Sequence, residues 1–108
     1  MPIPAATALP VESLIVPTPD GIASRVLGRT AGGSLTLFAF DAGQALTEHT
    51  SPYEAYVQVL EGTFVLTIGG TRVDAPAGAL VRMPANVPHA VEAASPARML
   101  LVMLKGEE

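Results

Sequence analysis

The chain has 108 residues, of which 49% are hydrophobic and 15% are charged, and its formal net charge is −4. This composition is too apolar for a disordered chain and predicts one packed domain. The negative charge, without a basic cluster, argues against a nucleic-acid partner, and the absence of cysteine excludes disulfide bonds, thiol catalysis and thiolate metal sites.

The N-terminal stretch MPIPAATALPVESLIVPTP has no basic region and no long apolar region, so it does not read as a secretory signal peptide. No apolar run in the sequence approaches the ~20 residues that a transmembrane helix needs. We therefore expect a soluble cytoplasmic protein with no membrane partner.

The first twenty residues hold five of the ten prolines. Proline lacks a backbone N–H and is confined to the edges of sheets. Residues 1–20 are therefore expected to form a proline-rich arm, in which residues 12–16 (ESLIV) form a short strand. Residues 21–108 are expected to form a single β-domain.

From residue 22 onward, short apolar runs alternate with glycine and proline, which is typical of an all-β sandwich or barrel. The expected strands cover residues 22–30, 33–40, 45–49, 55–61, 63–69, 71–75, 79–84, 89–94 and 97–105. Hairpins are predicted at Glu61-Gly62 and at Gly69-Gly70, where glycine supplies the positive φ of a tight turn. A third turn is predicted around Gly78.

The chain contains two histidines, His49 and His89, forty positions apart. Together with nearby glycines and one proline, the histidines form a pattern with fixed spacing. Its positions are Gly43, His49, Gly62, Gly78, Pro84 and His89. Five residues separate Gly43 from His49, and five separate Gly78 from Pro84. Over residues 33–104 this order resembles the two sequence motifs of the cupin superfamily.

The resemblance implies a fold, an assembly and a cofactor. Cupins are small jelly-roll barrels (double-stranded β-helices), they are often dimeric, and they usually hold one divalent metal ion. Their first motif places a second histidine and a glutamate after the first histidine, where this sequence has Ser51 and Ala55. Their second motif has glycine and asparagine where this sequence has Asn86 and Ala93. Two of the four usual metal ligands are thus present.

Because side chains alternate along a strand, Glu54, one residue out of register, should point away from the direction of Ala55. In a jelly roll, His49 and His89 can converge on one pocket. Neutral imidazole suits Zn, Ni, Mn, Fe or Cu to differing degrees. Two protein ligands predict weak binding, completed by water or by atoms of a ligand. The alternative is that both histidines are ordinary polar residues at strand ends.

Five further residues are candidates for the pocket: Phe38, Phe40, Ser51, Tyr53 and Met83. Phe38 and Phe40 share one face of their strand by the period of two, where they form either core or pocket wall. Met83, together with Met99 and Met103, suits either an adaptable pocket or the filling of a core. Tyr53 lies either at the pocket rim or over the turn that precedes it.

Two classes of function remain open. One is a barrel that binds a small organic molecule, with a divalent metal ion such as Zn, Ni, Mn or Fe held weakly by two histidines. The other is a metal-dependent cupin enzyme, dioxygenase-like or isomerase-like, on a small-molecule substrate; a purely structural homodimer is a third option. The high apolar content of so short a chain also predicts a two-fold symmetric homodimer, with the arm or an early strand packed across the partner.

Overall fold

The computed structural model describes residues 3–105, which fold almost entirely as β-strands, as the sequence predicts. Within this range the elements are a 3₁₀-helix η1 (Val11–Ser13) and the strands β1 (Ile22–Thr30), β2 (Gly33–Phe40), β3 (Ala45–His49), β4 (Glu54–Glu61), β5 (Thr63–Ile68), β6 (Thr71–Pro76), β7 (Leu80–Met83), β8 (His89–Ala93) and β9 (Ala97–Leu104). No helix among the described residues is long and apolar enough to cross a membrane.

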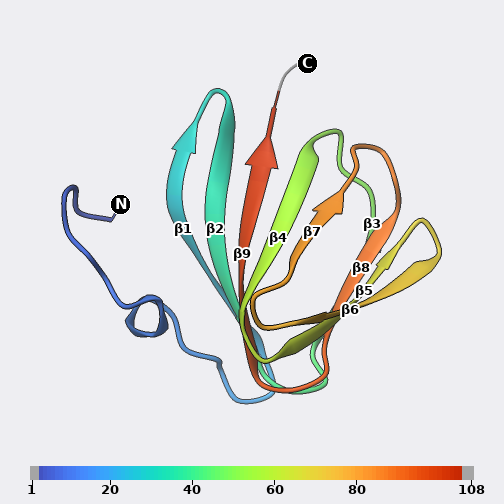
Figure 1. Ribbon diagram of the computed structural model, residues 1–108, viewed down its shortest axis with the longest axis horizontal. Helices are drawn as coiled ribbons and strands as arrows, with labels where there is room; N and C mark the ends of the chain where they lie inside the picture. The colour runs from blue at the N-terminus through green and yellow to red at the C-terminus, as the bar shows by residue number, and fades with distance from the viewer. Residues whose placement is uncertain (1–2, 106–108) are drawn as a thin grey trace.

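Two antiparallel sheets face each other to form a jelly-roll barrel (Figure 1). One sheet has five strands in the order β1-β2-β9-β4-β7, and the other has four in the order β3-β8-β5-β6. Strands far apart in the sequence are neighbours, because β9 lies between β2 and β4, and β8 lies between β3 and β5. This topology brings the end of β3 and the start of β8 together.

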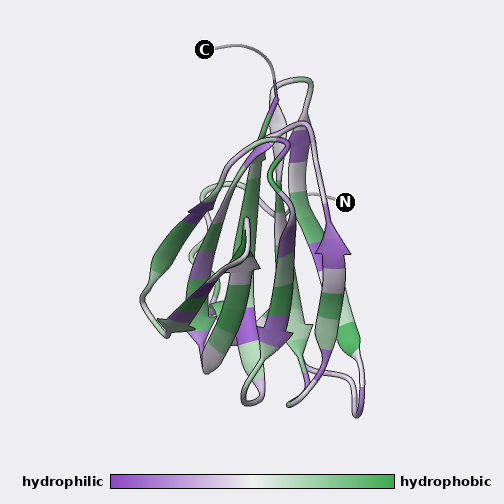
Figure 2. Ribbon diagram, turned by 90° about the vertical axis from the view of Figure 1, so that its right-hand side faces the viewer, coloured by the Kyte–Doolittle hydropathy of each residue, from purple (hydrophilic) through white to green (hydrophobic). Residues whose placement is uncertain are grey.

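The barrel interior is filled by alternate residues of each strand, and Figure 2 shows apolar and polar bands following one another along the strands. On β4 the inward residues Ala55, Val57 and Val59 are buried. Across the barrel, the ring of Phe64 on β5 meets that of Phe40 on β2 edge-on, with centroids 5.1 Å apart. Residues outside this alternation face solvent or the N-terminal segment.

The N-terminal segment contains no strand at residues 12–16, so that part of the prediction is wrong. Val11–Ser13 forms a 3₁₀ turn instead, in which the Ser13 amide donates to the carbonyl of Pro10. Arginine side chains take the place of strand partners: Arg25 Nη1 donates to the Leu14 carbonyl at 3.1 Å, and Arg98 Nε to the Ile15 carbonyl at 2.9 Å. Ile15 packs on the outer face of the five-stranded sheet.

The turn at Glu61-Gly62 is not a hairpin, because β4 and β5 belong to different sheets. Gly62 lies where the chain crosses from one sheet to the other, with φ of 73°. A Cβ there would run into the carbonyl oxygen of Pro96 and would lie 2.8 Å from the Cβ of Ala97. Glycine is thus required for two reasons, its backbone conformation and the close approach of the neighbouring chain. The hairpin at Gly69-Gly70 is confirmed, since β5 and β6 pair on either side of it.

We predict that Gly62→Ala destabilises the fold more than Gly70→Ala, which is the matched control. Gly70 also has a positive φ, of 83°, but a Cβ there meets open space. The left-handed backbone alone costs about 1–2 kcal/mol in both variants, and overlap with the crossing chain adds roughly 1–3 kcal/mol at Gly62. Urea unfolding gives the two free energies. Equal losses would contradict the close-approach argument.

Candidate functional site

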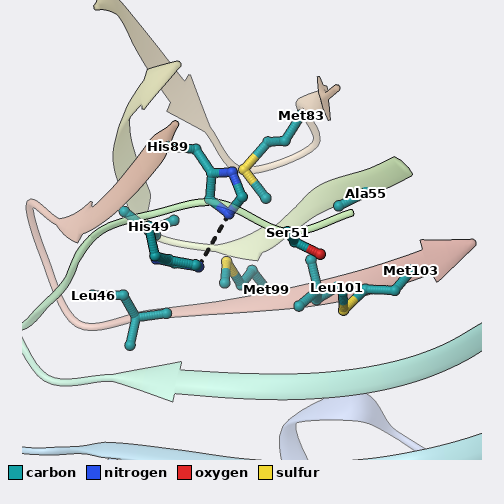
Figure 3. Close-up of a pocket in the computed structure, with 10 residues that line it drawn as sticks. Leu46, His49, Ser51, Ala55, Met83, His89, Met99, Leu101 and Met103 are labelled. Carbon is teal, nitrogen blue, oxygen red and sulfur yellow. Dashed lines mark hydrogen bonds between the residues drawn. The ribbon is translucent and has the colours of Figure 1, made fainter. Parts of the chain in front are cut away.

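The structure brings the two histidines into direct contact. His49 ends β3, His89 begins β8, and the two residues are register partners in the antiparallel pair of these strands. Their Nε2 atoms lie 3.1 Å apart, and their ring centroids lie 4.3 Å apart at 71° (Figure 3). The β3–β8 pairing thus makes a two-imidazole cluster from residues forty positions apart.

Backbone carbonyls fix which ring nitrogens carry protons. The Nδ1 atom of His49 lies 2.7 Å from the carbonyl oxygen of Thr47, and that of His89 lies 3.2 Å from the carbonyl oxygen of Val87. A carbonyl oxygen only accepts, so each Nδ1–H is the donor. In the neutral rings both Nε2 atoms then carry lone pairs, and these lone pairs face each other. Because two facing lone pairs repel each other, a cation between them, either a proton or a metal ion, would stabilise the arrangement.

His89 is the buried member of the pair, with 5% of its surface exposed, whereas His49 is exposed. Burial lowers the pKa of His89 below its ordinary value of 6.5, and the neighbouring His49 lowers the pKa further, while the hydrogen bond to Val87 acts in the opposite direction. A lowered pKa keeps the imidazole of His89 neutral into mildly acidic solution. Neutral imidazole is the form that binds metal ions.

A cavity of about 150 Å³ lies beside the imidazoles. Its lining residues are Leu46, His49, Ser51, Ala55, Met83, His89, Val91, Met99, Leu101 and Met103 (Figure 3). Apart from the imidazoles and the hydroxyl of Ser51, these side chains are apolar. The cavity therefore suits a small and largely apolar occupant that can present one polar group to the histidines.

The candidate pocket residues divide between the cavity and its surroundings. Ser51 and Met83 line the cavity, but Phe38, Phe40 and Tyr53 are not among its lining residues. Phe40 is fully buried in the core, and Phe38 packs against the same core with its ring 6.2 Å from that of Phe40. The amide of Tyr53 donates to the Ser51 hydroxyl at 3.3 Å.

The two positions where the family motif has metal ligands do face the cavity. Ser51 and Ala55 both line it, as the spacing from Gly62 predicts. Glu54 lies on the opposite side of the strand, where its carboxylate accepts from Arg82 Nε at 2.6 Å and from the Ala85 amide at 2.7 Å. The hydrogen bond from Arg82 and that from Ala85 lower the pKa of Glu54, so it stays ionised. The carboxylate of Glu54 is thus bound to Arg82 on β7 and to the loop after β7, and it does not face the cavity.

Asn86 adopts the left-handed backbone conformation that the family motif assigns to glycine, with φ of 63°. Asparagine tolerates this conformation better than most residues. The backbone N–H of Asn86 donates to the Ser51 carbonyl oxygen at 2.7 Å, and this hydrogen bond links the β7–β8 loop to the loop before β4. The substitution of glycine by asparagine therefore preserves the local backbone.

Part of the cavity wall comes from β9. Met99, Leu101 and Met103 alternate along this strand and share its inward face. The sequence offers Met99 and Met103 as pocket or core residues, whereas Leu101, Leu46 and Val91 carry no signal of their own. The period of two in ARMLLVML indicates that the three β9 side chains lie together, but it does not say which cavity they meet. That information needs the position of β9 between β2 and β4.

The cavity offers a single metal ion two imidazole ligands, His49 and His89. Two bonds of ~2.1 Å from one ion reach nitrogen atoms up to about 4.2 Å apart, so Nε2 atoms separated by 3.1 Å are within reach of a shared ion. Among residues 3–105, however, no group of three or more histidine, cysteine, aspartate or glutamate side chains is placed to hold a metal. Water molecules or atoms of a bound ligand would supply the remaining positions around the ion.

Comparison with known proteins identifies the family. The family model of the cupin domain matches residues 36–103 of this sequence. The chain belongs to the cupin family. No curated protein gives a significant match to this cupin.

Solved structures show the same fold over nearly the whole cupin chain. A conserved protein of unknown function from Streptococcus pyogenes is 33% identical, with a TM-score of 0.91 over 98% of this chain and 93% of the other. A cupin superfamily protein from Desulfitobacterium hafniense is 24% identical, with a TM-score of 0.91 over 98% and 97% of the two chains. A cupin 2 conserved barrel domain protein from Leptotrichia buccalis is 31% identical, with a TM-score of 0.82 over 86% of this chain and 45% of that one.

We predict that acidification destabilises this cupin partly through His89. As the pH falls below 6.5, the unfolded chain protonates this histidine before the folded chain does, so the free energy of unfolding decreases until the pH passes the lowered pKa of the folded state. His89→Gln removes this contribution. Denaturant unfolding of both proteins at several pH values between 8 and about 5 should show a steeper loss for the wild type. Parallel pH profiles would contradict the assignment.

Proposed function

We propose that this cupin binds a small, mostly apolar organic molecule in its barrel, and that a divalent metal ion held weakly by His49 and His89 helps to fix that molecule. The observation that carries the proposal is the juxtaposition of the imidazole pair with an apolar cavity. Catalysis is not part of the proposal.

The size and walls of the cavity narrow the class of ligand. A volume of about 150 Å³ is comparable to that of an engineered apolar cavity that accepts benzene. Polar groups are confined to the histidines and the Ser51 hydroxyl, so specificity for a polar substituent would come from that end. A compact aromatic or branched aliphatic molecule with one carbonyl or carboxylate group meets both requirements.

The divalent ion would supply Lewis acidity toward an oxygen atom of the ligand. His49 and His89 would hold it, with each Nδ1–H anchored to a backbone carbonyl so that the ring orientation is fixed. Ser51 and Ala55 add no imidazole or carboxylate. Two protein ligands therefore support weak binding of Zn, Ni, Mn or Fe.

The assembly and location of the chain are further proposals. Apolar side chains remain exposed at Val16 in the N-terminal segment and at Leu35, Leu80 and Leu104 on the five-stranded sheet. A homodimer in which the segment around Val16 packs across the partner would cover part of this surface. We place the protein in the cytoplasm as a second, separate proposal. Light scattering that gives the mass of one chain at micromolar concentration would reject the dimer.

Ligand binding can be followed at the methionine methyl groups. Met83, Met99 and Met103 line the cavity, so a molecule that enters it should shift their methyl NMR signals. We expect benzoate to shift these three signals, assigned with single Met→Leu variants, and Ala55→Phe, which fills the cavity, to abolish the shifts. Unchanged methyl signals for benzoate, benzene and isobutyrate alike would reject the proposed ligand class.

Metal binding is tested by calorimetry on protein purified without an affinity tag or chelator. We expect weak heats with Zn, Ni and Mn for the wild type, decreasing at acidic pH as protons compete for Nε2, and no binding by His89→Ala. Ser51→His with Ala55→Glu should strengthen binding by roughly two orders of magnitude, because four protein ligands replace two. No heat with any ion would reject the divalent metal, and no gain from the double replacement would contradict the cavity-facing geometry of Ser51 and Ala55.

A further inference from the structure

Three methionines line the same cavity as the imidazole pair. Met83 ends β7, and Met99 and Met103 lie on β9, so all three come from the five-stranded sheet, whereas both histidines come from the four-stranded sheet. Met83 and Met99 are 3% and 1% exposed. In Figure 3 their sulfur atoms lie on the side of the cavity where the imidazoles meet, and Met103 lies farther along β9, beyond Leu101.

The charge of an ion decides how well this cavity can hold it. The cavity donors are imidazole nitrogen, thioether sulfur and one hydroxyl, all of them neutral. Glu54, next to Ala55 in the chain, is turned away and hydrogen-bonded to Arg82. Since the Born cost of burial rises with the square of the charge, a monovalent ion costs about a quarter of what a divalent ion of the same size costs. A neutral and apolar site thus favours a monovalent ion.

The softness of the donors points the same way. Thioether sulfur is a poor ligand for hard divalent ions and a good one for Cu(I), which imidazole also binds. A closed-shell ion of this kind accepts two to four ligands without a strong preference for geometry, so two nitrogens and two sulfurs complete its shell. The second histidine and the glutamate of the first cupin motif, replaced here by Ser51 and Ala55, are not needed for such a shell.

We propose that the end of the cavity where the imidazoles meet is a Cu(I) site, whose ligands are the Nε2 atoms of His49 and His89 and the thioether sulfurs of Met83 and Met99. The proposal rests on the proposed two-histidine metal site and names the ion that this site prefers. Methionine in a core ordinarily only fills space. Here the sulfurs share a cavity with two lone pairs that already call for a cation.

The test is a competition for Cu(I) under anaerobic, reducing conditions, with bicinchoninate as the coloured competitor. The wild type is compared with Met83→Leu and Met99→Leu, and Met103→Leu is the control from the same cavity wall. Met→Leu nearly conserves volume and usually costs less than ~1.5 kcal/mol of stability, which thermal unfolding verifies. Zn binding by the same four proteins is measured by calorimetry.

We expect one Cu(I) per chain, bound more tightly than Zn. Met83→Leu and Met99→Leu should each weaken Cu(I) binding by about tenfold or more, while Met103→Leu should leave it within about twofold and none of the three should change Zn binding. Copper K-edge X-ray absorption should show sulfur scattering in the wild type that is lost in the Met83→Leu/Met99→Leu double variant.

The outcomes separate this proposal from the one on which it rests. If Zn or Ni binds but Cu(I) binds no more tightly, or if the double variant binds Cu(I) as the wild type does, the Cu(I) assignment is overturned and the two-histidine site stands. If no ion binds, or if His89→Ala binds ions as well as the wild type, both are overturned.

Discussion

Two imidazole lone pairs that face each other at 3.1 Å are the constraint around which the site is built. Each ring is held in this orientation by a hydrogen bond from its Nδ1 to a backbone carbonyl two residues earlier, so neither can turn away without losing that bond. The β3–β8 register places the rings opposite each other. A proton or a metal ion between them turns the repulsion into attraction, and the apolar walls strengthen either interaction.

The alternation of side chains along strands explains how much of this site the sequence could predict. The resemblance to the cupin motifs implies that both histidines and the two substituted positions, Ser51 and Ala55, face the inside of one barrel, and all four line the cavity. The alternation of side chains sends Glu54 outward, where Arg82 and Ala85 hold it. Local periodicity and a motif with fixed spacing were sufficient for these residues.

Other features depend on contacts between strands distant in the chain, and the sequence was misleading or silent about them. Residues 12–16 have strand-like composition, but arginines from β1 and β9 take the backbone carbonyls that a strand partner would use. Gly62 has the signature of a hairpin, yet the chain there passes to the opposite sheet. The role of Leu101 as a cavity wall follows from the position of β9 between β2 and β4, which no local pattern specifies.

The unequal exposure of the two histidines has a kinetic consequence. His89 is buried and His49 faces solvent, so an ion entering the proposed site would meet His49 first and, on leaving, would lose its contact with His49 last. Exchange of the ion would then be stepwise, and the motion of the exposed His49 imidazole would set its rate. The buried His89 imidazole would hold the ion inside the barrel.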